Sequence, residues 1–168
     1  MVGIYQKNKK GTDKMCKEKG YDLYPKVILS DCTISEIQIK DNKLILIFSS
    51  YGFAKKEEDG NYYRTEGAEI IVEDYDRDEI LIKEKRLHQL SEELYFESMF
   101  DIAFETLLKN VNSGKWKLEI VEEFYATGEG IYICHVREGK GTFWIFIKMR
   151  YRNIVYLWNN VRYDWIVN

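Results

Sequence analysis

The sequence predicts one α+β domain, in which a strongly curved, mostly antiparallel sheet of about eight or nine strands carries one long amphipathic helix. The last third of the chain, Lys115 to Asn168, holds all four tryptophans and 12 of the 25 aromatic residues. Glycine and asparagine turns divide this part into short alternating segments, which is typical of antiparallel strands. Residues 91–113 instead repeat apolar side chains at helical spacing. A length of 168 residues with 45% hydrophobic content suits a single packed core.

The chain begins with a lysine-rich stretch, residues 1–20, which we expect to form a basic and mobile arm. The single α+β domain is then expected at residues 21–168. Charge is unevenly distributed, with a net of +4 in residues 1–26, −11 in residues 27–136 and +4 in residues 137–168. The charges of these segments either average out in the folded protein or give it an acidic face and a basic face that attract different partners.

Two pairs of strands are expected in the first half of the domain. Residues 34–39 and 44–48 form a hairpin, because Asp41-Asn42 between them tolerates the left-handed backbone angles of a tight turn. The returning strand is apolar at successive positions, which indicates a central place in the sheet. A polar loop follows, and residues 62–73 and 79–87 then form the second pair.

The helix is expected over residues 91–113. Ser91 is a suitable N-cap with acidic residues in the first turn after it, and Gly114 suits the position just past the C-terminus. The apolar stripe of this helix consists of Phe96, Phe100, Ala103, Leu107 and Val111. A stripe of this width packs on a sheet. The predicted core includes Phe96, Phe100, Leu107, Trp116, Leu118 and Ile145.

Composition restricts the function classes. No apolar run approaches the ~20 residues of a membrane-spanning helix, and the start of the chain lacks the apolar core of a secretion signal, so we expect a cytoplasmic protein. The three cysteines, Cys16, Cys32 and Cys134, are far apart and form no paired motif, and the chain has only two histidines. We therefore expect no structural zinc, no bound cofactor and no cysteine nucleophile.

The C-terminal strands carry the best binding candidates. Trp144, Phe146, Lys148, Arg150 and Arg152 alternate with apolar residues and so share one face of a strand. Aromatic rings can stack on nucleic-acid bases while lysine and arginine contact phosphate, so binding of single-stranded nucleic acid is one interpretation of this row. The interpretation that we favour is an ordinary outer face, whose aromatic rings cover the edge of the core, because the chain is net acidic and has no ribonucleoprotein-type motif.

A hydrolase with a carboxylate and histidine site is a further alternative. Its candidates are Glu122, Glu123 and His135, which could supply an acid and a base if they converged in one pocket. Adjacent strand residues point to opposite faces of a sheet, so this arrangement is demanding. No serine or cysteine stands in a recognisable nucleophile motif, and we assign no catalytic residue.

Two passages carry a family resemblance. The run Leu29-Ser30-Asp31-Cys32-Thr33-Ile34 before the first hairpin resembles the opening of small uncharacterised bacterial proteins, some of which are immunity proteins that neutralise polymorphic toxins. Ser30 stands where that pattern has a histidine. The segment from Tyr156 to Asp164, with Trp158 and Arg162 as candidate binding residues, has the character of a family signature. The lack of a catalytic constellation, the acidic residues 27–136 and this resemblance together predict a non-enzymatic bacterial protein-binding domain, such as an immunity protein, whose acidic surface binds a basic protein such as a toxin.

Overall fold

The computed structural model describes residues 16–20 and 23–167 of the chain and shows a mostly β protein. Within these residues, 14 strands form two sheets, and α1 (Phe104–Asn112) is a helix of nine residues. The expected α+β architecture of eight or nine strands with a long helix is therefore wrong. The error lies mainly in residues 91–103, most of which belong to a β-hairpin.

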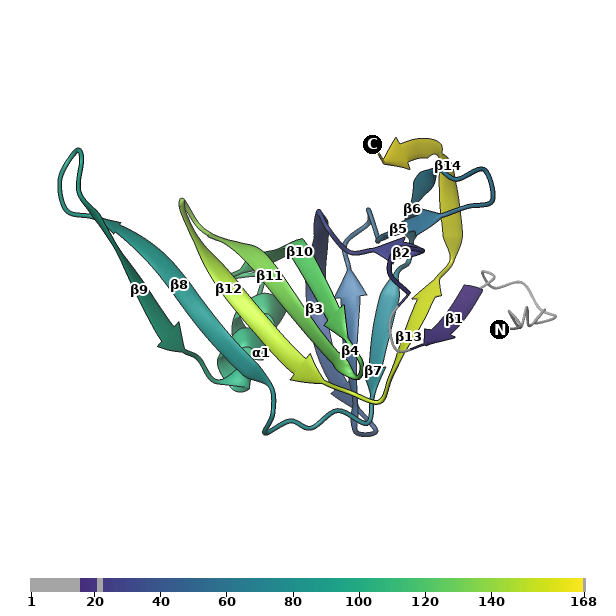
Figure 1. Ribbon diagram of the computed structural model, residues 1–168, viewed down its shortest axis with the longest axis horizontal. Helices are drawn as coiled ribbons and strands as arrows, with labels where there is room; N and C mark the ends of the chain where they lie inside the picture. The colour runs from purple at the N-terminus through teal and green to yellow at the C-terminus, as the bar shows by residue number, and fades with distance from the viewer. Residues whose placement is uncertain (1–15, 21–22, 168) are drawn as a thin grey trace.

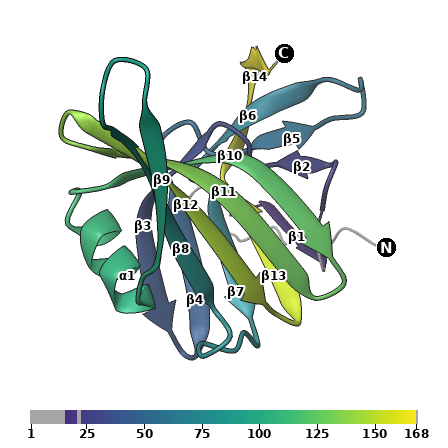
Figure 2. The same ribbon diagram turned by 60° about the vertical axis from the view of Figure 1, so that its left-hand side comes forward.

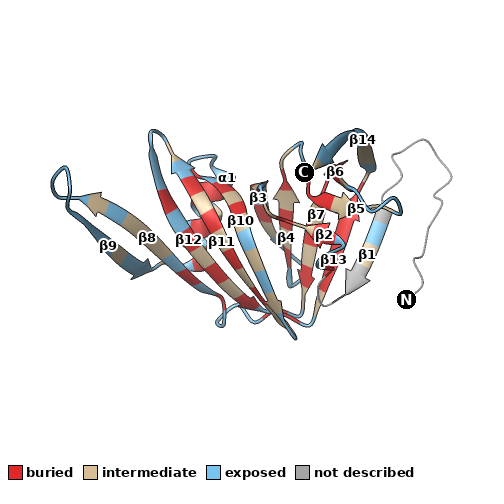
Figure 3. Cartoon of the chain, turned by 45° about the horizontal axis from the view of Figure 1, so that its top comes forward, coloured by how far each residue is buried: buried red, intermediate tan, exposed pale blue. Residues whose placement is uncertain are grey.

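The larger sheet has ten strands, and every neighbouring pair in it is antiparallel. Figure 3 shows its strands converging at one end and spreading at the other, so that the sheet is folded around its own core. In the order in which they lie side by side (Figure 1), the strands are β1 (Cys16–Gly20), β13 (Asn153–Trp158), β7 (Glu69–Glu73), β4 (Lys43–Phe48), β3 (Cys32–Lys40), β10 (Lys117–Ala126), β11 (Glu129–Glu138), β12 (Gly141–Arg150), β8 (Leu81–Gln89) and β9 (Tyr95–Asp101).

The first predicted hairpin is confirmed. Strands β3 and β4 are joined so that Lys40 pairs with Lys43, and the two turn residues Asp41 and Asn42 have φ values of 50° and 57°. These are the positive angles that a two-residue hairpin turn requires. Strand β4 lies between β3 and β7, as its apolar sequence indicated.

The second predicted pair of strands is wrong. Residues 62–73 break at Gly67, and the two halves, β6 (Tyr62–Glu66) and β7, belong to different sheets. Gly67 has a φ of 58°, a backbone angle that favours glycine, and a Cβ atom there would displace the Asn159 side chain. Strand β8 pairs with β12 and β9 on the far flank of the large sheet.

The smaller sheet packs at the spreading end of the large one and contains four strands (Figure 1). Phe53 is fully buried at this junction, with ring centroids 6.0 Å from Phe48, 6.0 Å from Tyr156 and 5.9 Å from Trp158. Edge-to-face aromatic contacts of this kind hold the two sheets together. The strands are, in sheet order, β14 (Asn160–Val167), β6, β5 (Ala54–Lys56) and β2 (Val27–Ile28).

Helix α1 begins after Ala103, which makes no side-chain cap, and ends at the predicted place, with Gly114 at a φ of 71°. Of the predicted core, Leu107, Trp116, Leu118 and Ile145 are buried. The assignments of Phe96 and Phe100 to the core are wrong, because these side chains are 45% and 55% exposed on β9.

The C-terminal end of α1 completes the large sheet where β3 leaves β10. These two strands pair only through residues 32–34 of β3. Beyond that point, the backbone N–H of Ile37 donates to Asn112 Oδ1 at 2.8 Å, and Asn112 Nδ2 donates to the Ile37 carbonyl at 2.7 Å. One side-chain amide therefore replaces the partner that a neighbouring strand would supply, and this fixes α1 against the sheet (Figure 2).

Residues 16–20 of the predicted N-terminal arm form β1, an edge strand paired with β13 from Cys16–Trp158 to Gly20–Ile154. The remainder of the arm, residues 1–15, lies outside the described residues. In the part of the chain that the structure describes, no helix has the length and apolar character needed to cross a membrane.

Candidate functional site

Around β12 the large sheet has an inner face that carries the core and an outer face that is open to solvent. On β12, Phe143, Ile145, Ile147 and Met149 point inward and are buried. Because side chains alternate along a strand, the even-numbered residues from Trp144 to Arg150 lie on the outer face. We call this set, Trp144, Phe146, Lys148 and Arg150, the β12 row.

Apolar side chains adjoin the aromatic half of the β12 row on its β11 side, whereas Lys85 and Lys83 of β8 lie opposite Trp144 and Phe146. Phe146 pairs across the sheet with Ile133 of β11, and Lys148 pairs with Ile131 on the same strand and with Leu81 of β8. Paired residues share a face, so Trp144, Phe146, Ile133 and Ile131 form an apolar strip on the outside of the sheet, and Lys148 separates Leu81 from it. Trp144 is 39% exposed there, with its ring centroid 5.2 Å from that of His135.

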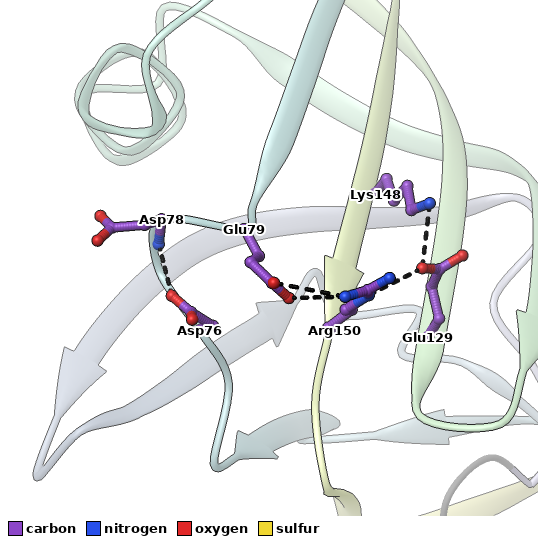
Figure 4. A network of polar contacts seen from close by, with 6 residues as sticks. All are labelled: Asp76, Asp78, Glu79, Glu129, Lys148 and Arg150. Carbon is purple, nitrogen blue, oxygen red and sulfur yellow. Dashed lines mark hydrogen bonds and ion pairs between the residues drawn. The ribbon is translucent and has the colours of Figure 1, made fainter.

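The cations of the β12 row are held by carboxylates from the neighbouring segments (Figure 4). Lys148 Nζ lies 3.1 Å from Glu129 Oε2, and Arg150 lies 3.4 Å from that same atom and 3.3 Å from Glu79 Oε2. The hydrogen bonds from Lys148 and Arg150 hold the pKa of Glu129 below its usual value. The outer face therefore presents paired charges beside its apolar strip.

The neighbouring strands repeat this pattern. Lys83 and Lys85 of β8 form ion pairs of 2.8 Å each with Asp101 and Glu97 of β9. Four basic residues on this side of the sheet are thus matched by carboxylates. Exposed ion pairs of this kind add little stability, but they cancel the positive potential that a phosphate backbone would need.

The remaining sequence-predicted binding residues lie elsewhere. Arg152 is exposed in the link between β12 and β13, where its backbone N–H donates to the Glu73 carbonyl at 3.2 Å. Trp158 is only 4% exposed and packs on Phe53. Arg162 is on β14 of the smaller sheet, where Asp164, 2.7 Å away, raises its pKa above the usual value. The structure therefore brings four of the seven predicted residues together.

The carboxylate and histidine residues of the hydrolase alternative lie on opposite faces. Glu123 pairs with Tyr132, which is buried in the core, whereas Glu122 pairs with Ile133 and points to the outer face with His135. A β-bulge between Ile120 and Glu122 sets this parity. Glu123 therefore does not meet the other two groups at one site.

The Glu123 carboxylate faces the core and makes hydrogen bonds that connect two segments of the fold. Its Oε1 accepts the backbone N–H of Leu29 at 2.7 Å, and its Oε2 accepts the hydroxyl of Tyr125 at 2.6 Å. Burial raises the pKa of Glu123 above its ordinary value, although both hydrogen bonds act in the opposite direction. The side chain joins β10 to the segment that precedes β3.

The two described cysteines are buried and unreactive. Arg64 Nη1 donates to Cys32 Sγ at 3.2 Å, but burial dominates and raises the pKa of the Cys32 thiol to about 12. Burial alone raises the pKa of Cys134 in the same direction. Both thiols therefore stay protonated at neutral pH and are poor nucleophiles.

A small cavity lies inside the larger sheet. This cavity of about 20 Å³ between α1 and the sheet is lined by apolar residues that include Phe104, Tyr132 and Met149, and this volume admits about one water molecule. Within residues 16–20 and 23–167, no group of three or more His, Cys, Asp or Glu side chains is placed to hold a metal ion. The exposed apolar strip and the paired charges beside it make the outer face the candidate functional surface.

Several residues of this surface were missed in the sequence. Phe124, Ile131 and Ile133 widen the apolar strip, Leu81 lies on the other side of Lys148, and Glu79 and Glu129 pair with the basic residues. Alternation within β11 was a usable signal for Ile131 and Ile133. Glu79 had no local signal as a partner of Arg150, because the two residues are 71 positions apart in the chain.

Comparisons with known proteins add no relative. No protein-family model, no curated protein and no solved structure matches the chain.

Proposed function

We propose that this protein is a non-enzymatic protein-binding domain that docks a partner on the outer face of its large sheet. The observation that carries the proposal is the pairing of the β12-row cations with Glu129 and Glu79 beside an exposed aromatic and aliphatic strip. A central apolar patch with a paired polar rim is the usual anatomy of a protein interface. Trp144 is the expected anchor, because exposed tryptophans often dominate binding energy.

The partner that we favour is a basic protein, and the specific role is that of a bacterial immunity protein that neutralises a toxin in the cytoplasm. Residues 27–136 carry a net charge of −11, which complements a basic toxin such as a nuclease. Charge complementarity raises the rate of association and makes that rate sensitive to salt. The resemblance in residues 29–34 supports the same role.

The test is capture of a partner from the native host by tagged protein, after nuclease treatment, with mass spectrometry of what remains bound. We expect one stoichiometric protein, retained by Trp165→Ala and lost from Trp144→Ala. Trp165 is the matched control because it is also 39% exposed but lies on β14 of the other sheet. With the purified partner, Trp144→Ala should weaken binding at least about tenfold. Unchanged binding by this variant would contradict the proposal.

Binding of single-stranded nucleic acid through the same row is the second candidate. The observation in its favour is that Trp144, Phe146, Lys148 and Arg150 do share one solvent-facing surface. It requires phosphates to displace Glu129 and Glu79 from their cations, and binding should then fall steeply with salt. A labelled oligonucleotide that still binds after Arg150 and Arg152 are both changed to alanine would exclude this mode.

A further inference from the structure

The hairpin of β8 and β9 is the most exposed apolar element of the described structure. It extends beyond the rest of the large sheet and ends in a free tip (Figures 1 and 2). Among the described strands, β9 pairs only with β8 and forms the edge of the sheet. The exposed large apolar residues of the hairpin are Leu81, Leu87, Leu90, Leu94, Tyr95, Phe96, Met99 and Phe100. An edge of this kind is a template for pairing with another strand.

The hydrogen bonds of the hairpin define which backbone groups point to the open edge. Ile102 N donates to Ile82 O at one end of the ladder, and Leu90 N donates to Leu94 O at the other. In an antiparallel pair, directly bonded residues alternate along each strand. The even-numbered residues of β9 therefore bond to β8. The odd-numbered residues direct their N–H and C=O groups outward, and they are Tyr95, Glu97, Met99 and Asp101.

The side-chain pattern of β9 is self-complementary in one antiparallel register. When two copies pair around Ser98, Glu97 faces Met99 of the other copy and Tyr95 faces Asp101. A shift by one bonded pair in either direction places Glu97 opposite Glu97 or opposite Asp101, and like charges opposite each other are destabilising. The register centred on Ser98 also pairs all four outward residues of each copy, which gives about eight backbone hydrogen bonds.

The other face of the hairpin fits the same register. Phe96 of each copy faces Phe100 of the other, in the closer, non-bonded type of pair that brings side chains together. Phe96 is already held in place, because its ring stacks on that of His88 at 4.5 Å between centroids. His88 Nε2 in turn lies 2.6 Å from Ser98 Oγ. The aromatic contact would therefore use a Phe96 ring that His88 already positions.

We propose that two copies of this chain associate through antiparallel pairing of their β9 strands, centred on Ser98, so that their ten-stranded sheets become continuous. This interaction is separate from the partner surface proposed above, and either can hold without the other. The charge pattern and the outward hydrogen-bonding groups of one strand specify both the occupant, a second copy, and its register.

The test exploits the contact of Met99 with Glu97 of the other copy. Met99→Glu should weaken the dimer at least tenfold, because it places two carboxylates opposite each other twice. Met99→Lys should keep or strengthen the dimer by pairing with Glu97. Within one copy Met99 lies opposite Lys85, so intrachain charge effects would run in the reverse order. Sedimentation velocity from about 1 μM to about 200 μM measures the dissociation constant.

Cross-linking checks the register independently. In a Cys16→Ser background, Ser98→Cys should form a disulfide-linked dimer on mild oxidation, because residue 98 faces itself in the non-bonded pair where Cα atoms are about 4.5 Å apart. Glu97→Cys is the control and should not cross-link. Circular dichroism confirms that each variant is folded. A wild-type monomer throughout the concentration range, or equal weakening by Met99→Glu and Met99→Lys, would overturn the proposal. The proposal would also be overturned if a different protein were captured by the wild type and lost when Met99 is changed. That result would assign the β9 edge to another partner.

Discussion

Replacement of Glu123 by glutamine should make the protein less sensitive to rising pH. In the folded state this carboxylate accepts hydrogen bonds from Leu29 N–H and the Tyr125 hydroxyl, but its burial raises its pKa above the ordinary value. The folded protein therefore holds the proton to a higher pH than the unfolded chain does. Between these two pKa values, the free energy of unfolding falls as pH rises.

The size of the effect follows from this linkage. Between the unfolded and folded pKa values of Glu123, the wild-type free energy of unfolding loses at most about 1.4 kcal/mol per pH unit relative to Glu123→Gln. The glutamine can still accept the Leu29 N–H and does not titrate. Glu123→Ala, in contrast, removes both acceptors, and leaving the buried donors unpaired should cost about 2–4 kcal/mol at all pH values.

Urea denaturation at a series of pH values from about 4 to about 8 measures these differences. The free energy of unfolding of the wild type minus that of Glu123→Gln should be largest in acid, should fall as pH rises, and should then become constant. Glu122→Gln, one residue away on the outer face, controls for loss of a carboxylate at the surface. A Glu123→Gln difference that stays constant or grows with pH would refute the assignment of a buried carboxylate that is destabilised by its environment.

Two further comparisons test the packing. Trp158→Ala should lower the free energy of unfolding by about 3–5 kcal/mol in the same urea assay, because the Trp158 ring is buried on Phe53. Trp144→Ala should change the free energy of unfolding by less than about 1 kcal/mol. Equal effects would contradict the assignment of Trp158 to the inner face and Trp144 to the outer face. Gly52→Ala should be far more destabilising than Gly60→Ala, since both have positive φ but only the first would place a Cβ 2.2 Å from the Thr65 carbonyl oxygen; a thermal melt in which the two shift Tm equally would show that the steric contact is relieved.

The strands of the C-terminal third could be predicted because their signals are local. Alternating residues give the face of each strand, and the turns at Gly128, Gly139 and Asn159-Asn160 separate β10 to β14 in sequence. Consecutive strands β10, β11 and β12 then pair as hairpins, and the parity of the β12 row was predictable for the same reason. Local pattern was sufficient for these three strands, which are neighbours both in sequence and in the sheet.

The helix was misplaced because its spacing fits two structures. Phe96 and Phe100 are four residues apart, a distance that returns to the same face of a helix and also to the same face of a strand. Ser91 strengthened the error, since its hydroxyl does accept the backbone N–H of Leu94, three residues ahead, at 3.2 Å. That bond is typical of an N-cap, but here it closes the tip of the β8–β9 hairpin. Local chemistry alone did not distinguish a helix from a β-hairpin in this segment.

The arrangement of strands that are distant in sequence was outside the reach of local patterns. Strand β8 pairs with β12, about 60 residues later in the chain, and not with the segment directly before it. The same long-range pairing brings Glu79 to Arg150 and changes a predicted phosphate-binding cation into one half of an ion pair. The residues of the candidate surface were thus largely predictable, but their electrostatic state was not.

Geometry also limits how the two proposed interactions combine. In a dimer joined at β9, five strand spacings of about 4.8 Å separate the β12 rows of the two copies, so these rows lie about 24 Å apart across one continuous sheet. Adjacent strands rotate by roughly 20–25°, and five such steps turn one row by more than about 100° relative to the other. Two outer faces turned this far from each other do not present a common surface to one compact partner. The dimer would therefore carry two independent partner sites, and binding at one would leave the other free.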